Sequence, residues 1–206
     1  TRKATFTPGR DAARKEASKL NVPRIGVRFR LPASMNQVEY FGRGPAENYL
    51  DRNAGSMIGL YKSTAEELYF PYVRPQENGH HTDTRWVSLS TGKKGLLIQA
   101  DNTIGFNALR NSIEDFDDEE ATGLPRQWSN FTPEQVANHD EAAAKSVLRR
   151  QHHINDITPR DFVEVCVDLK QQGVAGYDSW GSRPEPAYTL PANREYNWGF
   201  TLIPLK

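Results

Sequence analysis

Three things are scarce in this sequence: cysteine, net charge and long apolar runs. The 206 residues include a single cysteine, Cys166, so no disulfide can form within the chain. Lys plus Arg and Asp plus Glu number 26 each, so the chain lacks the positive excess that nucleic acids and anionic membranes require. No apolar run approaches the ~20 residues of a membrane span, and no signal peptide opens the chain. We therefore expect neither nucleic acid nor membrane as a partner.

The sequence also lacks an alternating pattern of strands and crossover helices, which argues against a catalytic (β/α)₈ barrel. Short apolar–polar alternations, punctuated by Gly and Pro, predict strands instead. The predicted strands are 3–7, 23–32, 37–41, 86–90, 96–100, 104–109, 162–170 and 196–204, with a strand-like stretch at 148–154. Residues 91–95 form the turn of a hairpin, and two short helices are predicted at 63–68 and 133–137. This pattern predicts one all-β domain, a sandwich or a barrel.

Residues 24–31 alternate basic and apolar side chains along one predicted strand. The apolar members, which should share one face, are Ile25, Val27, Phe29 and Leu31. With no net positive charge behind them, the arginines of the opposite face predict a solvated or salt-bridged surface rather than a nucleic-acid site. Cys166 lies in a similar alternation over 162–167, which predicts a small buried thiol.

The stretch 40–52, YFGRGPAENYLDR, mixes aromatic, Gly and polar residues. Its Gly42-Arg43-Gly44 lacks the third Gly and the Lys-Ser/Thr ending of a phosphate loop, and Pro45 follows at once. A rigid turn that carries polar residues is the better interpretation.

The stretch 71–86, PYVRPQENGHHTDTRW, contains Glu77, His80, His81 and Asp83, which have the chemistry of metal ligands. Neighbouring histidines in a strand point to opposite faces, and no spacing completes a tetrahedral set, so no metal is expected. Asn78-Gly79 favours a tight turn. Across that turn, Glu77 and Arg85 either pair with each other or belong to a polar cluster that bonds sugar hydroxyls.

The stretch 173–184, GVAGYDSWGSRP, is a Gly-flanked loop with Trp180 near its tip. Trp180 either folds into the core or projects, beside the polar Asp178 and Ser179, as an apolar platform for a sugar ring. His152 and His153 are either a general acid or base or ordinary structural histidines.

Four of these stretches, together with the tail 197–200, resemble the C-terminal "small chain" domain of family 2 glycoside hydrolase β-galactosidases, most closely those of gut Bacteroides-type bacteria. They are 20–27 (LNVPRIGV), 40–52, 71–86 and 176–180 (GYDSW). The resemblance implies a galactose-mutarotase-like "supersandwich", a large twisted antiparallel β-sandwich. It implies one domain over 1–206, with an N-terminal strand and loop over about 1–22 and the main body over 23–206. The family's upstream strands are missing, and a chain that opens on Thr1 fits a boundary inside a longer protein.

The resemblance also implies that the two catalytic Glu residues lie in a separate barrel domain of the parent chain. We therefore expect this chain to contain no catalytic residue, metal or cofactor and to be inactive alone. Its implied substrate contact is Trp180, with Asp178 and Ser179 in the same loop; Ala175-Gly176 replaces the more usual Gly-Gly before it. The residues Glu77, Asn78 and Arg85 are carried over as a polar cluster.

The implied partners are a galactoside, the barrel domain and further copies of the parent, in the cytoplasm or periplasm of a bacterium. Two alternatives remain at this point. A stand-alone aldose mutarotase or epimerase would need a His and a Glu that converge on a sugar, with His81, His153 and Glu77 as candidates. A simple carbohydrate-binding module would need only the sugar platform.

Overall fold

The computed structural model describes residues 2–6, 20–73, 76–116, 154–178 and 181–206. Its eight strands are β1 (Arg2–Phe6), β2 (Arg24–Pro32), β3 (Gln37–Gly44), β4 (Met57–Thr64), β5 (His81–Ser90), β6 (Gly95–Leu109), β7 (Phe162–Gln171) and β8 (Tyr196–Leu205). The helices of this part of the chain are single 3₁₀ turns, η1 (Ile113–Asp115), η4 (Ile154–Asp156) and η5 (Pro186–Tyr188). None of the helices described is long and apolar enough to cross a membrane.

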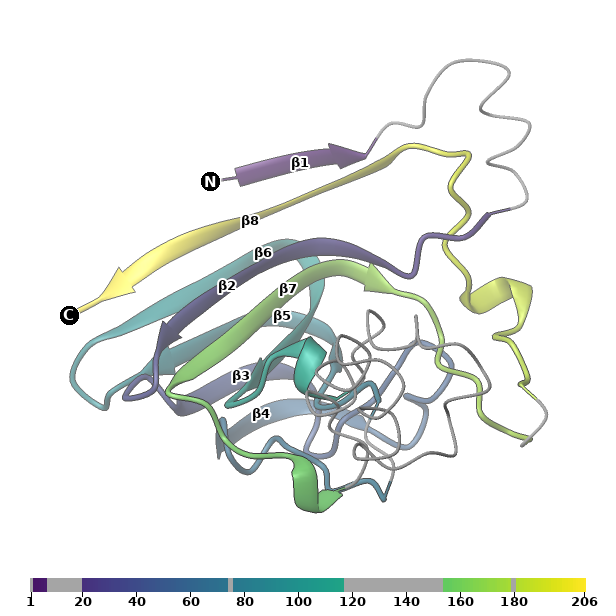
Figure 1. Ribbon diagram of the computed structural model, residues 1–206. Coiled ribbons are helices and arrows are strands. Elements are labelled where there is room, and N and C mark those ends of the chain that lie inside the picture. The colour runs from purple at the N-terminus through teal and green to yellow at the C-terminus, as the bar shows by residue number, and fades with distance from the viewer. Residues whose placement is uncertain (1, 7–19, 74–75, 117–153, 179–180) are drawn as a thin grey trace, which may run out of the picture.

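All the strand pairs are antiparallel, in the order β1-β8-β6-β5-β3-β4, and β7 joins β6 to β2 (Figure 1). Strand β6 pairs with β8 through residues 95–100 and with β7 through residues 105–109, so it passes from one part of the sheet to the other. The predicted all-β antiparallel sandwich is confirmed.

The main core contains the inward side chains of β3, β5, β6 and β7. Its members include Val38, Tyr40, Val87, Leu89, Ile98, Phe106, Val163, Val165 and Val167. From β2, Val27, Phe29 and Leu31 pack against this core as the alternation predicted. A register shift between Ile25 and Gly26 separates Ile25 from them, and Ile25 packs instead with Leu190 and Tyr196 in a smaller cluster. The predicted buried thiol of Cys166 is also confirmed, and burial raises its pKa to about 12.

The arginines of β2 form a salt-bridged face, as predicted. Arg28 and Arg30 both reach Glu164, a buried carboxylate on the paired strand β7, with Nε–O distances of 3.5 and 3.0 Å. Arg24 differs from the predicted surface residue, because its side chain is largely buried and pairs in the interior with Asp168.

Two predicted elements are wrong. Residues 63–68 are the end of β4 followed by a turn, although Thr64 and Glu67 exchange the bonds of a helix start: the Glu67 amide donates to Thr64 Oγ1, and the Thr64 amide to Glu67 Oε2. One turn forms, with Leu68 N bonded to Thr64 O at 3.0 Å, and Pro71 soon follows, which a helix cannot accommodate. Strand β4 itself was not predicted, because Met57, Ile58 and Leu60 are all exposed and break the alternation of a half-buried strand.

The second error divided β6 into 96–100 and 104–109. Asp101 and Asn102 look like a turn, but they continue the strand where its pairing with β5 is irregular and their side chains reach solvent. The predicted helix at 133–137, nearly all of the strand-like stretch 148–154, His152 and His153 lie outside the described residues; Ile154 begins η4.

Candidate functional site

A hollow of about 370 Å³ brings together three stretches that are far apart in the sequence. Its wall includes the turn after β3, the segment before β5, and the loop after β7. The lining residues are Pro23, Tyr49, Arg52, Tyr72, Gln76, Glu77, Gln171, Gln172, Gly173, Val174, Ala175, Gly176 and Pro184. The stretches 40–52 and 71–86 therefore meet the base of the loop that carries Trp180.

A buried carboxylate, Glu47, joins the stretch 40–52 to the stretch 71–86. It accepts hydrogen bonds from the Tyr49 hydroxyl at 3.1 Å, from the Gly79 amide at 2.7 Å and from the Tyr72 hydroxyl, and Arg52 lies 3.5 Å away. The Glu47 side chain is only 5% exposed, so these donors replace its water. Burial, reinforced by Glu47, raises the pKa values of Tyr49 and Tyr72, so both phenols remain donors.

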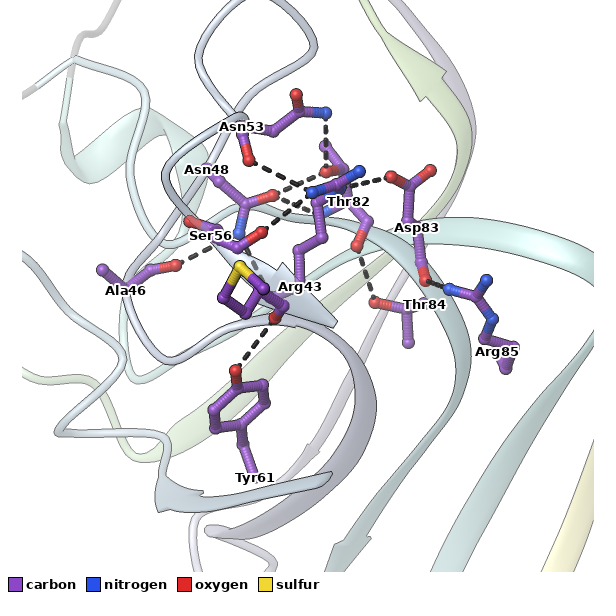
Figure 2. Close-up of polar contacts among 11 residues, drawn as sticks. Arg43, Ala46, Asn48, Asn53, Ser56, Tyr61, Thr82, Asp83, Thr84 and Arg85 are labelled. Carbon is purple, nitrogen blue, oxygen red and sulfur yellow. Dashed lines mark hydrogen bonds and ion pairs between the residues drawn. The ribbon is translucent and has the colours of Figure 1, made fainter. Parts of the chain in front are cut away.

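A second network holds the turn after β3 onto the start of β5 (Figure 2). Arg43 pairs with Asp83 at 2.5 Å and also donates to the Ser56 carbonyl at 2.8 Å. Asn48, which has no exposed surface, accepts from the amide and the hydroxyl of Thr82 at 3.0 and 2.6 Å. These bonds give residues 44–56 a defined shape and so place Tyr49 and Arg52 in the wall.

A buried polar cluster of Arg24, Asp168, Asn107 and His80 adjoins the wall of the hollow at Tyr49, whose ring stacks on that of His80. Arg24 Nε bonds Asp168 Oδ2 at 3.0 Å, and its Nη2 donates to Asn107 Oδ1 at 2.5 Å. His80 Nδ1 lies 2.8 Å from the same oxygen. Burial, with the Arg24 charge, lowers the pKa of His80 to about 3, so His80 is neutral and donates from Nδ1 to Asn107. Its 3.8 Å approach to Asp168 is therefore not an ion pair.

Burial also raises the pKa of Asp168 to about 7, which the Arg24 guanidinium opposes. The ion pair with Arg24 is the main interaction that keeps a carboxylate with 1% exposed surface ionised at this place.

The structure separates the predicted cluster of Glu77, Asn78 and Arg85. Glu77 is exposed and lines the hollow. Asn78 is buried and bonds the amide and the carbonyl of Phe70 at 2.9 and 2.6 Å, so its side chain shapes the segment and does not face a ligand. Arg85 lies elsewhere: it donates to the Asp83 carbonyl at 2.5 Å and covers the Phe41 ring at 5.6 Å, not Glu77.

Asp178, in the stretch 173–184, is exposed and accepts from the Ser182 amide at 3.3 Å. Its predicted neighbours Ser179 and Trp180 lie outside the described residues. His81, a candidate base in the mutarotase alternative, is fully buried between Tyr40 and Phe106, with ring centroids 5.0 Å from each. It is therefore inaccessible to a sugar and does not converge with Glu77.

Sequence reasoning missed Glu47, Tyr49, Arg52, Tyr72 and Gln171 as parts of this site. Three of them belong to the stretch 40–52, which was interpreted only as a rigid turn with polar residues. Its density of Tyr, Glu and Arg within six residues was the available signal, because these side chains commonly line polar pockets.

Known proteins with similar sequences point to one family. The family model described as "Beta galactosidase small chain" matches residues 3–202. A β-galactosidase of Priestia megaterium is 35% identical over 185 residues, and one of Vibrio cholerae is 29% identical over 181. These alignments cover 89% and 88% of this chain but only 15% and 14% of the two relatives. The chain thus spans about a seventh of the length of these relatives, and it belongs to the β-galactosidase small-chain family.

Proposed function

We propose that this chain forms one wall of the galactoside-binding site of a larger β-galactosidase, whose catalytic carboxylates belong to another domain. The supporting observation is the hollow that unites Tyr49, Arg52 and Glu77 with the base of the loop that carries Trp180. Tyrosine, arginine and carboxylate groups supply the donors and acceptors that sugar hydroxyls need, and the hollow is of the size of small-molecule sites.

In this proposal, Trp180 supplies the apolar surface for the sugar ring, beside Asp178 and Ser179, while Glu77 supplies a polar contact. Retaining and inverting glycosidases need two carboxyl groups across the scissile bond. Glu77 is the carboxylate exposed in the wall, whereas Glu47 is occupied by its four donors. A barrel domain of the same polypeptide would supply the catalytic pair, so the chain alone should not hydrolyse galactosides.

The test compares the full polypeptide that carries this chain with its Trp180→Ala variant on o-nitrophenyl β-D-galactoside. Loss of a stacking surface worth about 1–3 kcal/mol should lower kcat/KM by about 10- to 100-fold. Trp86→Leu is the matched control, because Trp86 lies in β5 outside the hollow and should change kcat/KM less than threefold. Equal effects of the two substitutions, or full activity of residues 1–206 alone, would contradict the proposal.

A further inference from the structure

The two sides of the hollow are connected by one side chain, that of Asp51. Residues 49–52 form a tight turn, with the Arg52 amide bonded to the Tyr49 carbonyl at 2.8 Å. Tyr49 and Arg52 line the hollow, where Glu47 fixes them. Asp51 lies between them in the sequence and bonds to the opposite side, the loop after β7.

The Asp51 carboxylate receives two backbone amides of that loop. Val174 N donates to Oδ1 at 3.1 Å, and Ala175 N donates to Oδ2 at 2.8 Å. Bonds from amides to a carboxylate are stronger than bonds between neutral groups. The two residues that follow the first amide have left-handed backbone, Ala175 with φ +53° and Gly176 with φ +84°. The chain thus turns sharply where Asp51 binds it.

Close packing also fits Asp51 to this loop. A Cβ on Gly173 would overlap the Asp51 carboxylate, so glycine is the residue that permits this approach. On its other side the loop begins with two backbone bonds, from Gln172 N to the Pro23 carbonyl at 2.9 Å and from Gly173 N to the Tyr188 carbonyl at 2.8 Å. Asp51 is the described side chain that links residues 174–175 to the turn with Tyr49 and Arg52.

From this geometry we infer that Asp51 is a positioning residue of the sugar site: it sets the loop that leads to Trp180 at a defined distance from Tyr49, Arg52 and Glu77. This inference rests on the proposed galactoside site. Asp51 itself acts through the loop, because its two oxygens are occupied by amides and it is not among the residues that line the hollow.

The experiment uses the full polypeptide that carries this chain and two substitutions, Asp51→Ala and Asp51→Asn. Hydrogen–deuterium exchange of a peptide over 171–178 reports the loop, and steady-state hydrolysis of o-nitrophenyl β-D-galactoside reports the site. Asp51→Ala should speed exchange about 10-fold or more and raise KM at least about fivefold, with a smaller change in kcat. Asp51→Asn should lie between it and the parent, because a single amide oxygen replaces two carboxylate oxygens.

Gly173→Ala tests the same contact from the loop, since the added methyl group would displace the Asp51 carboxylate without removing it. This variant should reproduce the faster exchange and the higher KM. The matched control is Asp101→Asn, an exposed carboxylate on β6 outside the hollow, which should leave both readouts as they are.

Unchanged exchange in Asp51→Ala would overturn the inference. Faster exchange with unchanged KM and kcat would overturn the role at the sugar site and leave a structural contact alone. If the parent polypeptide does not hydrolyse the galactoside, the proposed function fails, while the exchange measurement still tests whether Asp51 holds the loop.

Discussion

The surroundings of the hollow differ sharply from the outer surface of the sheet, formed by outward residues of β3–β6. Around the hollow, the buried polar groups Glu47 and Asn48 each bond several partners, and buried Asp168 pairs with Arg24. On the outer surface, apolar Phe41 faces Leu60 and Trp86 across neighbouring strands, with Leu60 58% exposed. We therefore expect substitutions of the buried polar groups to change stability far more than substitutions on the outer surface.

The largest difference in the free energy of unfolding should come from breaking one ion pair near the hollow and one on the outer surface. Arg24→Met leaves Asp168 buried without its partner and should lower the free energy of unfolding by about 3–5 kcal/mol. Lys62→Met breaks the 3.4 Å pair with Glu39 on the outer surface, where Lys62 is 74% exposed, and should cost no more than about 0.5 kcal/mol. Urea unfolding at pH 8 measures both, and similar losses would refute the contrast.

Asparagine gives the next comparison. Asn48→Ala removes the acceptor of Thr82 and the donor to the carbonyls of Arg43 and Ala46, all within the network of Figure 2. Buried partners left without bonds should lower the free energy of unfolding by about 2–3 kcal/mol. The exposed Asn102 on β6 is the control, and Asn102→Ala should lie within about 0.5 kcal/mol of the parent in the same unfolding assay.

Acid should lower the free energy of unfolding because of His81, which is fully buried. Burial lowers the pKa of His81 from the ordinary 6.5 to about 4. Between these values the unfolded chain binds the proton and the folded one does not, so stability is fully present above pH 6.5 and is lost as the pH falls towards 4. Acidification from pH 7 to 5 should cost the parent about 2 kcal/mol more than His81→Phe.

Using the difference between the parent and His81→Phe cancels the contributions of His80 and Asp168, which are common to both. Thermal or urea unfolding at pH 5, 6 and 7 gives the values. Parallel pH profiles for the two proteins would mean that His81 is protonated equally in the folded and unfolded states.

The smallest effect should come from the outer surface itself. Leu60→Ser exchanges an exposed apolar side chain for a polar one, and little surface is buried on folding at this position, so the free energy of unfolding should change by about 0.5 kcal/mol or less. Val87→Ser on strand β5, where Val87 is fully buried, is the contrast and should be clearly destabilising in the same assay.

Much of the fold was predictable from local patterns. Residues 25–31, 162–170 and 196–204 alternate clearly and form β2, β7 and β8. The failures occurred where a local pattern misrepresents the structure. Alternation reports only strands with one buried face, and strand β4 exposes Met57, Ile58 and Leu60. The Thr64 and Glu67 bonds imitate a helix start in a single turn.

The site was predicted only in part. The sequence placed Glu77 in a polar segment and Asp178 in a projecting loop, but it could not separate Arg85 from Glu77 or assign Asn78 to Phe70. Such pairings depend on where strands end in space. The distance between two side chains eight residues apart is not fixed by their spacing in the sequence when a turn lies between them.

By itself, the sequence determined the all-β class, the inward face of β2 at Val27, Phe29 and Leu31, the burial of Cys166 and the family, because these follow from periodicity and from long motifs in order. Tertiary structure alone decided that Arg24 enters the interior, that Glu47 gathers four donors, and that Asp51 receives amides from residues more than 120 positions away. Charged groups of one type are equivalent in a sequence; only the burial and the partners that the fold provides make them different.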